Sequence, residues 1–437
     1  MRRHSLLALT LALSACTPAQ SSPQRTVDPV HAPAAARDPR VIAAATNALG
    51  LDLYPRLATS PHANLVFSPA SIELALAMTW GGARGATADE MARVLYLTGA
   101  DPSAVHEGAS AQLALWEGTP TEGLELSVAN RLYGERTYQF HEAYLALTRD
   151  AWRAPLTTHD FMGDPEGGRQ LVNQWVSETT HQRIPEVLPA GSITGDTRLV
   201  LVNAIYMNAR WALPFADGRT TSEIFHARTE AALRLCADGT ERCEHLEETQ
   251  VPTMHQSDER FRYAHFDELR ALALPFVGGS LETWILLPDD RFGLERLEAR
   301  LTPELLSRIE RELESREVIV SLPRFRVDPP SSLALRETLS ALGMPLAFTE
   351  AADLSGMAEP GQAPLMISDV YHDAYLALDE NGVEAAASTA VVTVLTSAMI
   401  GGDPPEVFAA DHPFVFLVRD TRTGAVLFLG RVVDPRT

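Results

Sequence analysis

The sequence predicts an α+β fold in which helices pack around large antiparallel or mixed sheets. Segments with helical periodicity dominate the first half of the chain, and strand-like runs dominate the second half. Regular alternation of strands and helices is missing and no repeat occurs, which argues against a parallel doubly wound sheet and against a solenoid. No change of composition between residues 40 and 434 marks a linker, so one folded unit is expected.

Each element follows from its local pattern. Helices are expected where apolar residues recur three and four positions apart. They cover residues 39–58, 69–80, 102–116, 139–149, 165–181 and 302–313. Strands are expected where β-branched and aromatic residues form short runs. They cover residues 124–133, 198–208, 271–287, 316–327, 365–378, 414–419 and 425–430.

Composition excludes several function classes. The 437 residues carry 36 cationic and 57 acidic side chains, a net charge of -21, and every cation is Arg because the chain contains no Lys. An acidic surface repels phosphate backbones, so no nucleic-acid partner is expected. Without Lys, the chain cannot use the phosphate-binding lysine of P-loop enzymes, Schiff-base chemistry or Ser-x-x-Lys acylation.

The N-terminus has the pattern of an export signal. Arg2 and Arg3 precede an apolar run over residues 6–13, and Leu13-Ser14-Ala15-Cys16 resembles the bacterial lipobox, in which the Cys becomes lipidated. We therefore predict a signal peptide over residues 1–15. A lipidated N-terminus and flexible tether are expected over residues 16–38, which are rich in Pro, Ala, Ser and Gln. An ordinary secretory signal with a chance Cys is the alternative.

Two further cysteines, Cys236 and Cys243, flank an Asp-Gly turn. In an oxidising compartment this spacing favours a hairpin disulfide over two free thiols. No metal site is expected here, because two Cys supply only half of the ligands that structural zinc requires.

An unusual segment runs from Val383 to Ile400. Its eighteen residues contain no Gly or Pro and a single charge, Glu384. Because ordinary strands have about 3 to 10 residues, the segment is an unusually long strand, a helix or a segment that changes state. With a period of two, Val383 and the uncharged residues that alternate with it share one face, while Glu384 lies on the other.

These residues carry a resemblance to a known family. The chain resembles a serpin from about residue 40 to residue 434. The hinge DENGVEAAAST and the ending ADHPFVFLVRDTRTGAVLFLGRVVDP match the family, as do NLVFSPASI, LVNAIYMNARW, VPTMHQ and LPRFRV followed by ADLSGM. The resemblance implies a domain over residues 39–437, with a large central mixed sheet, two further sheets and an exposed reactive loop at about 380–408.

The resemblance also implies a function. Serpins trap a serine or cysteine protease as an acyl-enzyme on the cleaved loop, which then inserts into the central sheet and distorts the protease. The implied partner is thus a protease held covalently, and the protein itself is not an enzyme. By similarity, the "shutter" under the sheet comprises Ser68, Ser71, Asn203 and His372, and Trp211 lies at the "breach" where the loop enters.

The hinge residues agree with an inhibitory member, because they are mostly small. The hinge comprises Glu380, Gly382, Val383, Glu384, Ala385, Ala386 and Ala387. Counting seventeen residues from Glu380 places the cleaved bond at Thr396-Ser397. The loop is longer than in related serpins, so Leu395-Thr396 and Met399-Ile400 compete. No Arg occurs between residues 380 and 418, which favours elastase-, subtilisin- or chymotrypsin-like targets.

Two other functions are alternatives to protease inhibition. An exported hydrolase is disfavoured because the chain contains no Gly-x-Ser-x-Gly, His-Glu-x-x-His or Cys-x-x-Cys motif. A non-inhibitory serpin-fold binding or structural lipoprotein is the second alternative. We expect a monomer without cofactor or metal. No heparin-like activator is expected, because residues 101–130 contain no cation. The protein is expected at the bacterial cell envelope on a lipid anchor, or outside the cell if the lipid signal is not used.

Overall fold

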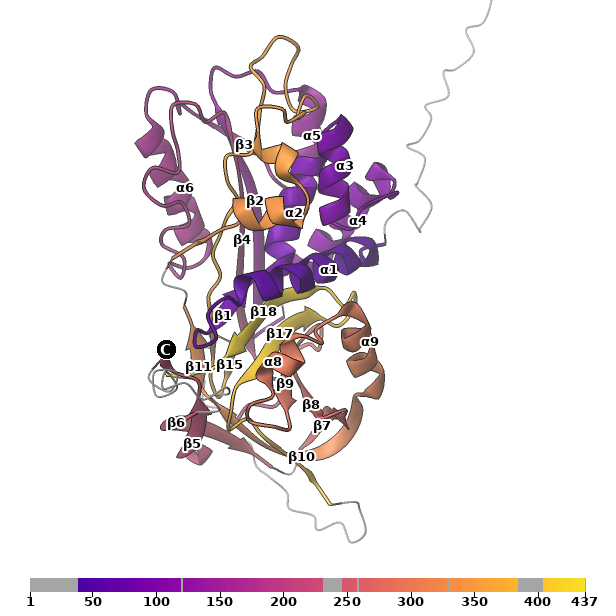
Figure 1. Ribbon diagram of the computed structural model, residues 1–437, viewed down its shortest axis with the longest axis vertical. Coiled ribbons are helices and arrows are strands. Elements are labelled where there is room, and N and C mark those ends of the chain that lie inside the picture. Colours follow the sequence, from indigo (N-terminus) through magenta and orange to yellow (C-terminus); the bar gives the residue numbers. More distant parts are fainter. Residues whose placement is uncertain are drawn as a thin grey trace, which may run out of the picture.

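The computed structural model of the chain describes residues 38–118, 121–230, 246–257, 259–328, 331–383 and 404–436. Most helices lie toward one end of an elongated molecule, and a twisted sheet forms much of the other end (Figure 1). The helices are α1 (Arg40–Leu57), α2 (Pro69–Trp80), α3 (Gly85–Val94), α4 (Pro102–Trp116), α5 (Glu142–Asp150), α6 (Pro165–Thr179), α8 (Leu294–Glu298), α9 (Pro303–Glu312) and α10 (Arg336–Leu342).

The strands include several long ones and many short ones. They are β1 (Leu65–Phe67), β2 (Leu124–Glu135), β3 (Leu156–His159), β4 (Leu199–Arg210), β5 (Thr221–Ala227), β6 (Glu247–Gln256), β7 (Arg260–Phe266), β8 (Leu269–Pro275), β9 (Leu281–Pro288), β10 (Glu314–Pro323), β11 (Phe325–Val327), β12 (Leu333–Ala334), β13 (Tyr371–His372), β14 (Leu376–Leu378), β15 (Gly382–Val383), β16 (Glu406–Ala409), β17 (Phe414–Asp420) and β18 (Val426–Val432).

Four helices begin with the same local device, a capping side chain followed by Pro. Ser68, Asp101, Asp164 and Thr302 each accept a hydrogen bond from a backbone N–H of the first turn, and Pro occupies the next position. The cap satisfies an N–H that has no partner within the helix, and Pro lacks the N–H that would otherwise need one. These starts are therefore fixed by adjacent residues in the sequence.

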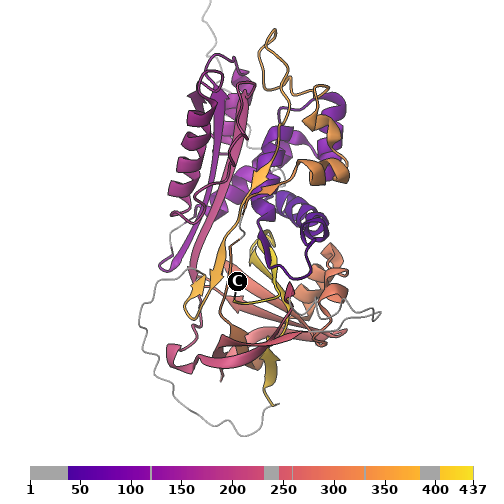
Figure 2. The ribbon, with the colours of Figure 1, turned by 60° about the vertical axis from the view of Figure 1, so that its left-hand side comes forward.

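The strands form three sheets among the described residues. A ten-stranded sheet has the order β1-β18-β17-β9-β8-β7-β10-β6-β5, with β16 beside β10. A six-stranded mixed sheet has the order β11-β14-β15-β4-β2-β3, and β12 and β13 form a small pair. The long antiparallel strands β2 and β4 run along the six-stranded sheet (Figure 2). The expected α+β class with large mixed and antiparallel sheets is confirmed.

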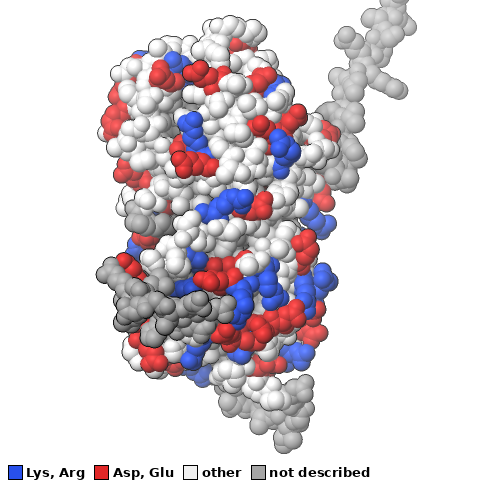
Figure 3. Space-filling view, viewed as in Figure 1, with Lys and Arg blue, Asp and Glu red and all other residues white. Residues whose placement is uncertain are grey.

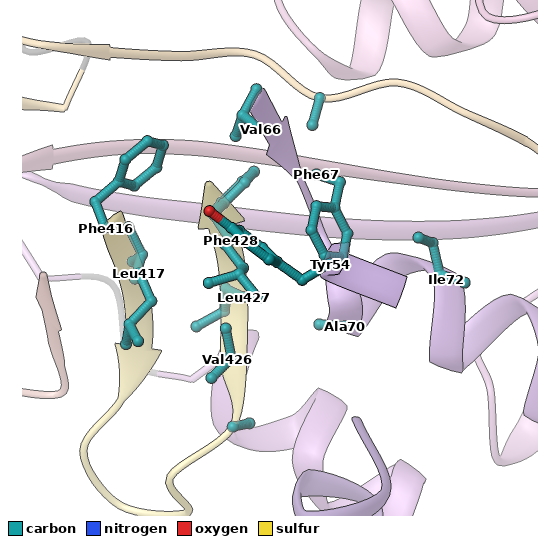
Figure 4. Packing of buried hydrophobic residues seen from close by; sticks show 14 of the residues in the cluster. Tyr54, Val66, Phe67, Ala70, Ile72, Phe416, Leu417, Val426, Leu427 and Phe428 are labelled. Atoms are coloured by element: carbon teal, nitrogen blue, oxygen red, sulfur yellow. The ribbon is translucent and has the colours of Figure 1, made fainter. Parts of the chain in front are cut away.

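The main core lies between α2 and the two large sheets. Side chains of α1, β1 and α2 meet those of β17 and β18, among them Tyr54, Phe67 and Phe428 (Figure 4). A second, smaller cluster lies between α6 and the outer face of the six-stranded sheet and includes Val202 and Ala204 of β4. The alternation of side chains along a strand explains the division, since the odd-numbered residues of β4 face the main core.

Arg side chains over the surface pair with neighbouring acids, as Arg169 of α6 does with Glu166 at 2.7 Å. On the face shown in Figure 3, acidic and basic side chains are interspersed.

Some expected elements differ from the structure. The expected strand over residues 271–287 is the hairpin β8–β9, because Gly278 and Gly279 adopt positive φ angles of 79° and 67° and turn the chain. The expected strand over residues 365–378 contains only β13 and β14. Helix α3 and the strands β5, β6 and β7 were not expected, since their polar and charged residues mask the apolar pattern.

Candidate functional site

The proposed loop hinge begins inside the six-stranded sheet. Strand β15 lies between β14 and β4, where Val383 pairs antiparallel with Ala209 and with Leu378. Val383 is only 2% exposed and belongs to the main core cluster. The hinge thus occupies the sheet through Val383 in the intact chain, with its side chain on the core side.

Gly382 makes this close approach possible. Its φ of 149° lies in a region that L side chains rarely adopt, and a Cβ built on it would lie 1.9 Å from the carbonyl oxygen of Ala209. Only glycine fits here without moving β15 or β4.

Glu380 is anchored just before β15. The Nε of Arg324 donates to its carboxylate at 2.6 Å, and the hydroxyl of Thr220 donates to the same oxygen. Burial by itself would raise the pKa of Glu380, but these hydrogen bonds outweigh burial and hold the pKa below its usual value. The carboxylate therefore stays charged and ties the turn to two other segments.

Trp211 supports the same turn from the end of β4. Its indole Nε1 donates to the carbonyl of Asp379 at 2.9 Å, and its backbone N–H donates to that of Asn381 at 2.8 Å. The ring stacks on Phe276 with centroids 4.6 Å apart. Two hydrogen bonds and a stacked ring thus place this turn at the end of the sheet.

Beyond β15 the neighbouring strands separate. On one side β4 pairs with β2 along its whole length, but on the other side its described partner is β15, which reaches only Ala209 and Arg210. Among the described residues, no strand pairing joins residues 199–208 to the segment 365–378. We call this gap in the six-stranded sheet the slot.

A cavity of about 90 Å³ lies at the slot, toward the end far from β15. Its walls come from α2, from β4, from the chain that follows α6 and from residues 365–372. Ser71, Asn203 and His372 all line it. Residues 132 or more positions apart in the sequence therefore meet at one place under the open sheet.

The four shutter residues are close together but are not all hydrogen-bonded to one another. The N–H of Ser68 donates to Nε2 of His372 at 2.9 Å, and the Ser68 hydroxyl accepts from the N–H of Ser71 at 3.1 Å. Asn203 instead donates to Oδ1 of Asn130 on β2, and its own Oδ1 has no partner among the described residues.

His372 is neutral in this environment. Burial lowers its pKa to about 3, because a charged imidazole would lose its hydration without gaining an anionic partner. Since Nε2 accepts from Ser68, the proton of the neutral ring is on Nδ1.

Other expected site residues lie outside the described residues. These are Cys16, Cys236, Cys243, Glu384, Ala385, Ala386, Ala387, Leu395, Thr396, Ser397, Met399 and Ile400.

Sequence reasoning missed Arg324, Thr220 and Asn130. A buried Glu in the hinge requires a cationic partner, so an Arg following β10 could have been sought. Asn130 carries no comparable signal, because its role depends on the register that places it opposite Asn203.

The described residues offer neither a metal cluster nor a membrane-spanning helix. No cluster of three or more His, Cys, Asp or Glu side chains is placed to hold a metal ion there. Among the helices of the described part, none is long and apolar enough to span a membrane.

The geometry can therefore accept a strand. Among the described residues, β4 has no strand partner on this side beyond Ala209 and Arg210, the hinge lies at one end of the slot and the cavity lies toward the other, which is suited to strand addition.

Comparisons with known proteins agree with this arrangement. The serpin (serine protease inhibitor) family model matches residues 44–435. Human leukocyte elastase inhibitor is 36% identical over 406 residues, covering 90% of this chain and 99% of that protein. An uncharacterized serpin-like protein of Thermococcus kodakarensis is 36% identical over 392 residues, covering 90% of this chain and 85% of the relative.

Solved structures give the same result. Uncleaved ovalbumin superposes with a TM-score of 0.74 at 29% identity, covering 90% of this chain and 100% of that structure. Cleaved Serpin 42Da superposes with a TM-score of 0.76 at 28% identity, covering 91% and 99%. The family model spans most of the chain and the similar proteins are covered over most of their length, so this chain belongs to the serpin family.

Proposed function

We propose that this protein is a suicide-substrate inhibitor of serine proteases. A protease attacks a bond of the loop that follows β15 and forms an acyl-enzyme. The freed loop then adds to β4 in the slot, and the attached protease is distorted before the acyl bond is hydrolysed. The slot is the observation that most supports this proposal, because the hinge lies at one of its ends.

The observed register defines how the loop would insert. Val383 lies opposite Ala209, so a strand that continues antiparallel places residue 387 opposite Ile205 (383+4 and 209−4) and residue 393 opposite Leu199 (383+10 and 209−10). Val383 faces the core, so Ala385 and Ala387 would follow it there. Glu384 would face outward. Small uncharged residues thus take the buried positions.

The energy of insertion is sufficient for the proposed step. About ten added residues would form on the order of ten backbone hydrogen bonds, each contributing about 1 kcal/mol. Displacing an oxyanion-hole donor slows acyl-enzyme chemistry by about 100- to 1,000-fold, which requires only about 3 to 4 kcal/mol.

The target class follows from the loop sequence. We propose elastase-, subtilisin- or chymotrypsin-like enzymes, with cysteine proteases as a further possibility, because the loop offers Thr396-Ser397, Leu395-Thr396 or Met399-Ile400 and no Arg. The similarity to leukocyte elastase inhibitors of several mammals supports this class.

The test is direct. The protein is mixed with active-site-titrated elastase, subtilisin, chymotrypsin and trypsin, and the products are separated on a denaturing gel. We expect a complex that survives boiling with at least one of the first three, and mass spectrometry of the released C-terminal peptide identifies the bond. Cleavage by all of them without any such complex would favour the alternative, a non-inhibitory binding or structural lipoprotein.

We also propose that Cys16 carries a lipid that anchors the protein to the cell envelope. The lipobox-like Leu13-Ser14-Ala15-Cys16 supports this. In a lipoprotein-processing bacterial host, Cys16→Ser should move the protein from the membrane fraction to the soluble fraction, because the acidic remainder is repelled by anionic lipid. A variant that still fractionates with membranes would contradict the anchor.

A further inference from the structure

The turn before β15 contains the only Asn-Gly pair of the sequence, Asn381-Gly382. Every other Asn is followed by Ala, Leu, Arg or Gln. An Asn followed by Gly deamidates most readily, because the backbone nitrogen of Gly attacks the Asn side chain without hindrance from a Cβ. The hinge therefore contains the one pair of the chain with the chemistry of rapid deamidation.

Asp379 lies against the nitrogen that would attack. Its Oδ1 accepts a hydrogen bond from the backbone N–H of Gly382 at 3.3 Å and another from that of Asn381 at 2.7 Å. Burial raises the pKa of the Asp379 carboxyl above its usual value, although these hydrogen bonds act in the opposite direction. A carboxylate of raised pKa is a stronger base, and this one already contacts the proton that must leave.

The oxygen of the same peptide group also has a hydrogen-bond donor. The backbone N–H of Trp211 donates to the carbonyl oxygen of Asn381 at 2.8 Å. When the Gly382 nitrogen loses its proton, negative charge spreads onto this carbonyl oxygen, where a fixed N–H stabilises it. The turn thus holds a base at the nitrogen and a donor at the oxygen of the peptide group that must react.

We propose that Asn381 deamidates in the folded protein, with Asp379 as the general base. The Gly382 nitrogen gives its proton to Asp379 and attacks Cγ of Asn381, which closes a succinimide ring. The C–N bond of the side-chain amide breaks, and its nitrogen takes the proton from Asp379 and leaves as ammonia. Water then opens the ring at either carbonyl and yields Asp or isoaspartate at position 381. The chemistry needs no protease, so it stands or fails independently of the proposed function.

The products should loosen the hinge. Either product adds a carboxylate beside Asp379 and Glu380, and like charges at close range repel one another. Isoaspartate also adds its Cβ to the main chain before Gly382, where a Cβ built on the glycine would already lie 1.9 Å from the carbonyl oxygen of Ala209. The modified chain should therefore lose the pairing of β15 with β4.

The experiment follows the deamidation of Asn381 by peptide mass spectrometry, with isoaspartate identified by fragmentation of its Cα–Cβ bond. Wild type and Asp379→Asn are incubated at neutral pH, either folded in buffer or unfolded in urea. The amide of this variant keeps an oxygen that accepts both hydrogen bonds but is not basic, and the residue after it is Glu380 rather than Gly. Folded Asp379→Asn should deamidate at residue 381 about 100-fold more slowly than folded wild type, the lower end of what a placed base contributes. In urea the two proteins should deamidate at equal rates.

A second measurement needs only wild type. Because the base is in place only in the folded turn, the folded protein should deamidate at residue 381 faster than the same chain in urea. A slower rate in the folded state, or equal rates for folded wild type and folded Asp379→Asn, would overturn the proposal.

The effect on the hinge is measured by limited proteolysis near residue 382 during ageing. Cleavage should increase with the deamidated fraction in wild type and stay constant in Asn381→Ser, which cannot form the ring. An equal increase in both proteins would show that deamidation does not loosen β15.

Discussion

His372 shows how one side chain under the sheet couples protonation to stability. It is buried against α2, and its Nε2 accepts a hydrogen bond from the backbone N–H of Ser68, the N-cap residue of that helix; no acidic side chain among the described residues pairs with it. A neutral imidazole fits this place, and a cation does not. The stability of the fold around His372 should therefore depend on pH.

The linkage between protonation and folding determines how the stability changes with pH. The pKa of His372 is about 3 in the folded protein, and the unperturbed value of 6.5 applies to the unfolded chain. Between these two pH values the unfolded chain therefore binds more protons than the folded protein. Its contribution to the free energy of unfolding is present above pH 6.5 and is lost as the pH falls, by up to a few kcal/mol. Between pH 7 and 4, the melting temperature of His372→Gln should fall less than that of wild type.

Wild type must be compared with His372→Gln because the neighbouring Asp373 also titrates in this pH range. Burial raises the pKa of this neighbouring carboxyl to about 6, which acts in the opposite direction between pH 4 and 6. Both proteins contain Asp373, so its contribution cancels when the pH profile of the melting temperature of His372→Gln is subtracted from that of wild type. Parallel pH profiles for the two proteins would contradict the assignment.

Gly382 carries the second residue-scale prediction. Gly382→Ala places a Cβ against the carbonyl of Ala209, so β15 should leave the sheet and expose the hinge. We expect a loss of about 1 to 3 kcal/mol in the free energy of unfolding and faster proteolysis near residue 382. Gly361→Ala is a suitable control, because Gly361 also has a positive φ but no atom within 4 Å of its Cβ position. Equal losses in the two variants would show that backbone strain alone is responsible.

At the scale of elements, strand alternation predicts which loop residues must be small. Ala387→Arg would bring a guanidinium to the core side of the inserted strand, opposite Ile205, which costs several kcal/mol. It should therefore turn the inhibitor into a substrate that is cleaved and released. Ala386→Arg, one residue away on the outer face, should retain most inhibition. The measurement is the number of inhibitor molecules consumed per protease inactivated.

The variants Ala386→Arg and Ala387→Arg test insertion more cleanly than a substitution at Val383. Val383 is already buried between β4 and β14 before cleavage, so Val383→Arg would disturb the intact sheet as well as insertion. If Ala386→Arg and Ala387→Arg lose inhibition equally, the proposed register is incorrect.

The sequence predicted most long elements but not their partners. Helices such as α2 and α4 begin with a capping residue and a Pro, so the local sequence determines where they start. Strands β5 and β6 contain few apolar residues without regular spacing, so their pairing with each other is visible only in the fold. The segment 365–378 contains only β13 and β14, and no described strand pairing joins it to β4, which no local pattern encodes.

Some residues of the candidate site could also be predicted from the sequence, whereas others could not. The hinge and the residues Ser68, Ser71 and His372 could be proposed from motifs. The Arg324 and Thr220 contacts with Glu380 and the amide pair of Asn130 and Asn203 depend on segments brought together by the fold. Residues whose roles depend on register across a sheet are not visible in a single sequence.

At the scale of the whole molecule, the described part of the six-stranded sheet has a strand position beside β4 that no described strand fills. The hinge enters at one end, and the cavity beside His372 lies toward the other. If the loop fills this position, it pairs with β4 and fills the cavity at the same time. The cleaved chain should therefore be more stable than the intact chain, although one of its peptide bonds has been hydrolysed.

The most direct test of this account is the unfolding temperature of the protein before and after a single cleavage in the loop between residues 384 and 403. Cleavage by a protease at low concentration is confirmed by mass spectrometry, and both forms are then heated in the same buffer. We expect a rise of about 10 °C, because the inserted strand adds on the order of ten backbone hydrogen bonds to a sheet, each contributing about 1 kcal/mol. An unchanged or lower unfolding temperature in the cleaved protein would show that the slot does not accept the loop and would contradict the proposed mechanism.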